Sequence, residues 1–234
     1  MSTAGSAMRE RPRLGVGAPK PLLDPEMERR LTPRQRELID ALEEVAVSGG
    51  LADLTMAQIA ARTHCSLRTL YGIAQSKDEL VLAVVDRRLH RIGRHAIASL
   101  DAPLAPIDAL RAYMSAVGEA VDPERNAFSR EFAMLPGGQR MLDAHERYVI
   151  AVVKSLLDRA VTERAIAPCD TASVAHALGG LGREFARPEV ADAARRSPKA
   201  TVEELADIIL RGLVARSGDA AVSRRRARAR GGGT

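Results

Sequence analysis

Residues 55–80 read Thr-Met-Ala-Gln-Ile-Ala-Ala-Arg-Thr-His-Cys-Ser-Leu-Arg-Thr-Leu-Tyr-Gly-Ile-Ala-Gln-Ser-Lys-Asp-Glu-Leu. Thr55, Ser66 and Ser76 each precede a helix-permissive run, where a side-chain oxygen accepts hydrogen bonds from the free amides of a first helical turn. Ser76 is followed three residues later by Glu79, which is the spacing of a reciprocal capping box. These signals predict two short helices joined by a tight turn, followed by the start of a third helix.

The two short helices carry an apolar side on which they can pack against each other, made of Ile59, Ala60, Cys65 and Leu70. The opposite side of the second helix presents Leu67, Arg68, Thr69 and Tyr71. A short helix that is held against another, with cationic and hydroxyl side chains projecting, suits entry into a DNA major groove.

The stretch resembles the helix-turn-helix of the TetR family of bacterial transcriptional regulators. Residue type and spacing agree with the family pattern at Thr55, Ile59, Ala60, Ser66, Leu70, Tyr71, Ser76, Lys77 and Leu80. The agreement extends upstream over residues 34–50, and beyond about residue 100 it is only architectural. The resemblance implies a cytoplasmic, nucleoid-associated bacterial regulator that contacts double-stranded DNA through Thr55, Ser66, Leu67, Arg68, Thr69, Tyr71, Gly72 and Lys77.

Three positions depart from the family pattern. His64 stands where the family has a turn glycine, so we expect a left-handed backbone at a residue that tolerates it better than a branched one. Ile73 and Ala74 replace an aromatic pair, and Ile73 or a neighbour is expected to fill that space. Gly72 directly after Tyr71 is expected to shorten or loosen the end of the second helix.

Charge is unevenly distributed along the 234 residues, whose formal net charge is +5. Residues 32–77 contain five cations and five acids, whereas residues 1–31 contain six against four and residues 216–234 six against one. We therefore expect flexible basic ends to add attraction to DNA that does not depend on base sequence. For the tail, an ordinary disordered end is an equally good interpretation.

Several functional classes are disfavoured by the sequence. No apolar run is long enough to span a membrane. Cys65 and Cys169 are isolated thiols without metal-ligand spacing, so we expect no metal and no cofactor. No nucleophile turn or glycine-rich phosphate loop supports catalysis, and we expect that the chain is not an enzyme.

The predicted fold is all-α, with a three-helix helix-turn-helix domain followed by a helical bundle, because prolines cut a helix-periodic sequence into segments without β-branched alternation. We divide the chain into a disordered basic arm at 1–31, the DNA-binding domain at 32–80, an effector-binding and dimerisation domain at 81–216 and a disordered basic tail at 217–234. About nine helices are expected, at 33–48, 55–62, 66–72, 76–100, 105–121, 124–134, 138–165, 170–186 and 202–216.

An apolar stripe along residues 138–165 is expected to face the interior of the bundle. Together with neighbouring helices, it suggests a pocket for a small, mostly apolar effector, lined by Tyr113, Phe128, Phe132, Met141, His145, Tyr148 and His176. For each bulky side chain, plain core packing is the alternative. For the two histidines, the alternative is a hydrogen-bonded core residue.

The helix expected at 170–186 is rich in small residues, which permit close approach of another helix. The family resemblance implies a homodimer formed by the last two long helices, and we assign to its interface Ala175, Gly179, Gly180, Ile208, Ile209 and Leu213. The expected function is repression from a pseudo-palindromic operator, relieved by the effector. A ligand-independent or partner-controlled DNA-binding factor, or an activator, remains the alternative.

Overall fold

The computed structural model describes residues 17–22, 29, 31–47, 51, 54–118, 132, 134–185, 187, 190 and 196–231, with side chains as far as Val214. Within these ranges the regular structure is entirely helical, which confirms the all-α class. The helices are α2 (Pro33–Val47), α3 (Met56–Arg62), α4 (Leu67–Tyr71), α5 (Lys77–Ala98), α6 (Pro106–Gly118), α8 (Gly138–Thr162), α9 (Thr171–Phe185) and α11 (Pro198–Gly231). The helix expected at 124–134 falls almost wholly outside the described residues.

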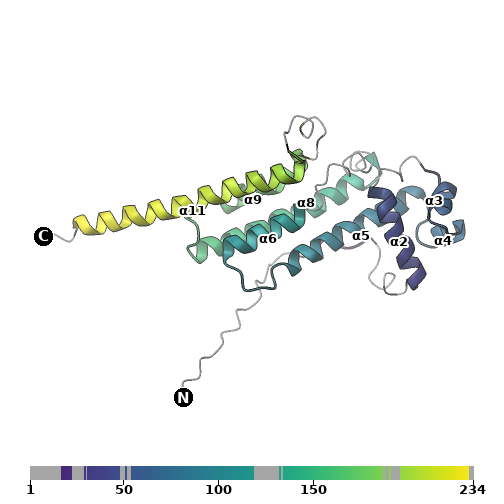
Figure 1. Ribbon diagram of the computed structural model, residues 1–234, viewed down its shortest axis with the longest axis horizontal. Coiled ribbons are helices and arrows are strands. Elements are labelled where there is room, and N and C mark those ends of the chain that lie inside the picture. The colour runs from purple at the N-terminus through teal and green to yellow at the C-terminus, as the bar shows by residue number, and fades with distance from the viewer. Residues whose placement is uncertain are drawn as a thin grey trace, which may run out of the picture.

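The N-terminal domain packs α2, α3 and α4 around the first half of α5, at one end of the molecule (Figure 1). Its core is mostly aliphatic and includes Leu42, Ile59, Leu70 and Leu80, none of which exposes any surface. Ile73 and Ala74, which replace the aromatic pair of the family pattern, are also buried in this core.

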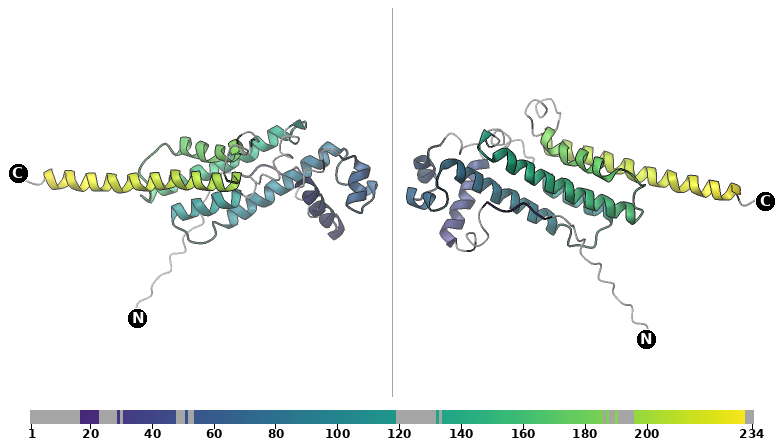
Figure 2. Two further views of the ribbon diagram at one scale, coloured as in Figure 1. Left: turned by 45° about the horizontal axis from the view of Figure 1, so that its top comes forward. Right: turned by 180° about the vertical axis from the view of Figure 1, so that it is seen from behind.

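The second half of α5 continues into a bundle with α6, α8, α9 and α11 (Figures 1 and 2). The bundle core includes Leu110, Tyr113, Val152 and Leu157. The inward stripe predicted along α8 is confirmed for its C-terminal half, where Val152, Leu156 and Ala160 are buried. One long helix, α5, therefore belongs to both domains.

The helix caps lie where the sequence predicted them, but the reciprocal capping box forms at a different helix from the one expected. Ser66 and Ser76 cap α4 and α5, and the side chain of Ser76 accepts from the Glu79 amide. Glu79 itself accepts from the Gln75 amide at 2.9 Å. The reciprocal box forms instead at α3, between Thr55 and Gln58.

The C-terminal helix is longer than expected. It begins at Pro198 and its backbone continues to Gly231, whereas the sequence suggested 202–216 followed by a disordered tail. That prediction of disorder is wrong for the backbone as far as Gly231. Alanine and arginine, which are strong helix formers, dominate the segment before the terminal glycines and allow the helix to continue. The end of α11 extends beyond the bundle (Figure 2).

Part of the basic arm packs against the folded domain. Residues 17–22 lie against α5, where the amide of Leu22 donates to Asp86 Oδ2 at 2.7 Å. The carbonyl of Pro19 lies 2.9 Å from His90 Nε2. The expectation of disorder over residues 1–31 is therefore wrong for this piece, because α5 presents a buried carboxylate and an imidazole that bind its backbone.

Candidate nucleic-acid interface and effector pocket

The helix-turn-helix is built from α3, α4 and the turn between them. Within the turn, His64 has φ of 49°, so the left-handed backbone expected there is present. The turn is held by the Cys65 amide, which donates to the carbonyl of Ala60 at 2.9 Å, and by the Thr63 hydroxyl, which donates to the carbonyl of Ile59 at 2.8 Å. These bonds fix the angle at which α4 leaves α3.

The outer side of α4 is available to a partner. Leu67 and Tyr71 are 42% and 48% exposed, and Arg68 is exposed beside them. Ser66 and Thr69 are partly committed to capping, with 2.8 Å between their hydroxyl oxygens. The helix ends at Tyr71 and Gly72 serves as its C-cap, as expected.

Two further predicted contacts lie at neighbouring helix starts. Thr55 caps α3 from an exposed position, and Lys77 begins α5 in a half-buried one. A cation that the sequence interpretation left out also lies near this surface. Arg34 of α2 donates to the carbonyl of His64 at 3.4 Å. Arg34 lies on the helix before the motif, and no sequence pattern there indicated that it would lie near the DNA-binding surface.

A cavity of about 350 Å³ lies between the N-terminal segment, α5 and α8. It is lined by Ala18, Pro19, Leu89, His90, Gly93, Arg94, Ile97, Ala98, Asp101, His145 and Tyr148. His145 and Tyr148 are thus the predicted effector residues that the structure brings to one site. The walls differ from those expected, because α5 and residues 18–19 form most of the lining.

The other predicted effector residues lie elsewhere. Phe132 and Met141 pack with the core of the N-terminal domain. His176 is exposed on α9, with Nδ1 2.9 Å from the carbonyl of Ala172 in its own helix, so its assignment to an inward-facing pocket is wrong. The small residues of α9 let that face turn toward α8 and leave His176 outside. Phe128 lies outside the described residues.

Tyr113 is fully buried in the bundle core, and its hydroxyl has no hydrogen-bond partner among the described residues. Burial raises the pKa of Tyr113 well above its usual range, and Tyr148 adds to the effect. Tyr148, which acts on this pKa, also lines the cavity.

A polar cluster that the sequence interpretation missed lies beside the cavity, and its two histidines are part of the lining. Asp86 and His90 are one turn apart on α5, and His145 approaches from α8. Asp86 Oδ1 is 3.3 Å from His90 Nδ1 and 3.3 Å from His145 Nε2. The two imidazoles meet edge to face with ring centroids 4.8 Å apart.

Electrostatics favour the charged forms of Asp86 and His90. Burial by itself acts to raise the pKa of Asp86, but hydrogen bonds from His145, His90 and the Leu22 amide hold that pKa well below its usual range. The hydrogen bond with Asp86 raises the pKa of His90 to about 9 and outweighs the opposing effect of burial. The cluster therefore places a charged His90 at the cavity lining and a charged Asp86 beside it.

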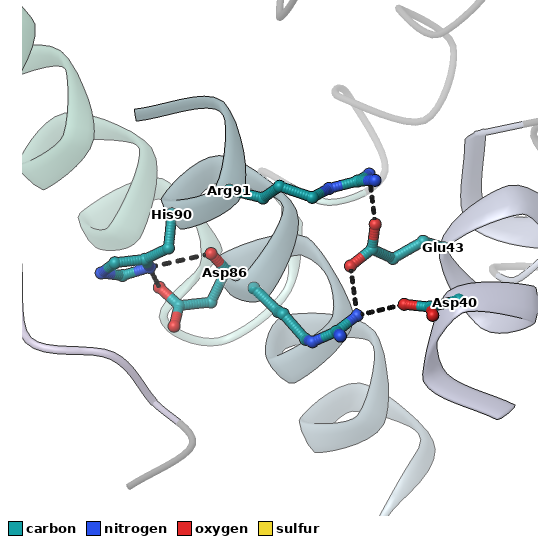
Figure 3. Close-up of polar contacts among 6 residues, drawn as sticks. Asp40, Glu43, Asp86, His90 and Arg91 are labelled. Atoms are coloured by element: carbon teal, nitrogen blue, oxygen red, sulfur yellow. Dashed lines mark hydrogen bonds and ion pairs between the residues drawn. The ribbon is translucent and has the colours of Figure 1, made fainter. Parts of the chain in front are cut away.

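The opposite face of the same turn of α5 binds the DNA-binding domain. Arg87 Nη1 is 2.6 Å from Asp40 Oδ1 and 3.0 Å from Glu43 Oε1, both on α2. Arg91 Nη2 is 2.5 Å from Glu43 Oε2. Figure 3 shows the two sets of contacts on opposite sides of α5. The four-residue spacings of Asp86 with His90 and of Arg87 with Arg91 are the signals that could have revealed them.

The six residues assigned to a dimer interface divide into two groups. Ala175 and Leu213 are buried in the protomer, so their assignment to a surface contact is wrong, and Ile209 packs against the same core. Gly179 is also packed internally, since a Cβ there would lie 2.5 Å from Ile150 Cγ1. Gly180 has open space around its Cα, and Ile208 is 58% exposed, so both are available to a partner.

Comparison with known proteins shows a family to which the N-terminal domain is similar. Residues 38–84 match the family model described as bacterial regulatory proteins, tetR family. This is a family of regulators, in agreement with the expectation that the chain is not an enzyme. No curated protein matches the chain.

Solved structures share the fold over most of the chain. A transcriptional regulator from Pseudomonas aeruginosa PAO1 is 22% identical with a TM-score of 0.62, covering 80% of this chain and 94% of that one. The fatty acid degradation regulator FadR from Bacillus halodurans is 14% identical with a TM-score of 0.63, covering 79% and 98%. AibR, solved with isovaleryl coenzyme A and operator DNA, is 18% identical with a TM-score of 0.55, covering 75% and 97%.

Among the described residues, every helix is too short or too polar to cross a membrane.

Proposed function

We propose that this chain, whose helix-turn-helix belongs to the tetR family of bacterial regulatory proteins, represses transcription as a homodimer that a small acyl compound releases from its operator. The observation that carries the proposal is the double role of α5. His90 of α5 lines the cavity and is paired with Asp86, while Arg87 and Arg91 in the same stretch of the helix bind α2.

DNA recognition is assigned to α4. A base edge in the major groove is read by a side chain that projects from an exposed helix, and Arg68 has the two-pronged donor geometry that suits guanine. Tyr71, Lys77 and Thr55 are assigned to phosphates, which position a protein on DNA without reading its sequence. Arg34, next to the turn, adds a further cation to the same surface.

The homodimer follows from the geometry of operators. A lone helix-turn-helix binds weakly, and two recognition helices about 34–36 Å apart read successive major grooves of a pseudo-palindrome. Gly180 on α9 and Ile208 on α11 are the surface residues to which we assign the contact.

The effector class follows from the lining of the cavity. Leu89, Ile97 and Ala98 supply an apolar wall, while Arg94 and Tyr148 supply donors for a carboxylate or carbonyl group. A volume of about 350 Å³ suits a small molecule. AibR was solved with an acyl thioester, and FadR from Bacillus halodurans is a regulator of fatty acid degradation, so acyl ligands occur on this fold.

Release requires that the effector prefer one arrangement of the dimer. A ligand with equal affinity for the DNA-binding and non-binding arrangements shifts nothing, however tightly it binds. Because α5 is held to α2 by the buried carboxylate of Glu43, a displacement of α5 at the cavity moves the helix-turn-helix with it. This supports coupling between the two sites through one rigid element.

The experiment is a two-part titration. Operator DNA is first selected from random duplexes with the full chain, and short straight and branched carboxylic acids and their coenzyme A thioesters are then screened for operator release and for a rise in melting temperature. We expect release by one class of acyl compound, a weakened response in Arg94→Ala, and an unchanged response in His176→Ala as the matched exposed control.

Three results would contradict the proposal or a part of it. Specific DNA binding that no acyl compound alters would favour a ligand-independent or partner-controlled factor. Binding upstream of a promoter with stimulation of transcription would favour an activator. Absence of any sequence preference would contradict the regulator itself.

A further inference from the structure

We infer that Asp86, His90 and His145 form a binding site for a divalent transition-metal ion, of which Zn²⁺ is the reference case. The site goes beyond the proposed function, because the ion would bind whether or not an acyl effector exists. The site was not expected from the sequence, because His90 on α5 and His145 on α8 lie 55 residues apart.

The spacing of the donor atoms suits a metal ion. Ligand atoms from the three side chains all lie within 4.8 Å of one another, and Asp86 Oδ1 is 3.3 Å from each of two histidine nitrogens. Bonds of about 2.1 Å in tetrahedral geometry place ligand atoms roughly 3.4 Å apart. The two separations that involve Asp86 already have this value, so only the two imidazoles have to approach each other.

The hydrogen bonds around the cluster have the pattern that surrounds metal ligands. The second ring nitrogen of a ligating histidine commonly donates a hydrogen bond to a backbone carbonyl, and a ligating carboxylate also accepts hydrogen bonds. His90 Nε2 lies 2.9 Å from the carbonyl of Pro19, and Asp86 Oδ2 accepts from the Leu22 amide at 2.7 Å. These contacts hold the His90 ring and the Asp86 carboxylate in place, with His90 Nδ1 and Asp86 Oδ1 3.3 Å apart.

The oxygen atoms around His90 Nδ1 favour a positive charge at the centre of the cluster. His90 Nδ1 faces the side-chain oxygen of Asp86 and also its backbone oxygen at 2.9 Å, so two acceptors converge on one ring nitrogen. A proton on His90 meets this need in the metal-free protein. A metal ion meets it as well and in addition engages His145 of the facing helix.

The donor set selects the class of ion. Two imidazoles and one carboxylate favour zinc, iron, cobalt or nickel, whereas Ca²⁺ and Mg²⁺ prefer oxygen ligands. Three protein ligands leave a coordination position open, and His90 and His145 both line the cavity, so that position faces a space that admits a small molecule.

The test measures metal binding to the full chain. Protein stripped with a chelator is titrated with ZnCl₂ by calorimetry and with CoCl₂ by absorption spectroscopy. We expect one ion per chain, at least about 100-fold weaker affinity in Asp86→Asn and His145→Gln, and no change in His176→Gln. Leu22→Pro removes the outer amide donor without touching a ligand, and we expect it to weaken affinity about 10- to 100-fold.

A second measurement does not depend on the folding of variants. Long-range ¹H–¹⁵N NMR of the parent protein reports each histidine ring nitrogen, and Zn²⁺ should shift Nδ1 of His90 and Nε2 of His145 but not the ring of His176. Failure of the parent to bind either ion at micromolar concentration would overturn the site. Binding that leaves both cluster histidines unshifted, or that persists in Asp86→Asn, would also overturn it.

Discussion

Glu43 of α2 and Arg87 of α5 form an ion pair at 3.0 Å in which the carboxylate side chain is only 3% exposed. The same carboxylate binds Arg91 through its other oxygen at 2.5 Å. Two arginines from one face of α5 therefore neutralise a single buried acid of the DNA-binding domain. This contact makes the orientation of α2 dependent on that of α5.

The two arginines differ in burial, so their removal should differ in cost. Arg87 is 17% exposed, and Arg87→Met should lower the free energy of unfolding by about 3 kcal/mol, because Glu43 loses its buried partner. Arg91 is 59% exposed, and Arg91→Met should cost less than about 1 kcal/mol. Urea unfolding of the two variants measures the difference. Equal losses would show that the buried pair does not dominate this contact.

Among the residues that the structure describes, none pairs with the buried hydroxyl of Tyr113, so its removal should not weaken the fold. We expect Tyr113→Phe to be neutral or to stabilise the protein by up to about 1 kcal/mol, because an unpaired buried polar group is costly. Thermal melting without ligand tests this. A loss of more than about 1 kcal/mol would mean that the hydroxyl makes a hydrogen bond in solution.

Substitutions at two adjacent glycines of α9 should affect different contacts, one within the protomer and one between protomers. Gly180→Glu should dissociate the dimer and leave the melting of the protomer intact, because space around this Cα is open. Gly179→Ala should instead destabilise the protomer by about 1–3 kcal/mol, because the new methyl group meets Ile150. Sedimentation and melting curves distinguish the two effects. A parent protein that sediments as a monomer would contradict the dimer itself.

Local sequence signals predicted the helix-turn-helix well because its geometry depends on near neighbours. Caps at Ser66 and Ser76 act within one turn, and the left-handed His64 follows from a single tight turn. The orientation of α9 was predicted less well. Its small residues permitted close packing without indicating which face is covered, so His176 was placed inside although it is exposed.

The cavity wall could not be predicted because its parts come from three distant segments. His145 was recognised as a polar residue on an apolar stripe, but its partner Asp86 lies on another helix. Pro19 belongs to a segment whose proline-rich composition indicated disorder, and it is held there by contacts with α5. At the other end of the chain, composition indicated a disordered tail although its alanine and arginine residues also favour a helix.

The most direct test of the central claim is fluorescence anisotropy of one selected duplex and one random duplex with the parent, Arg68→Ala and Lys77→Ala. The parent should prefer the selected duplex. Arg68→Ala should lose about 1–3 kcal/mol of that preference, whereas Lys77→Ala should weaken binding to both duplexes alike. Parent-like affinity and preference in both variants would contradict the assignment of α4 as the recognition helix.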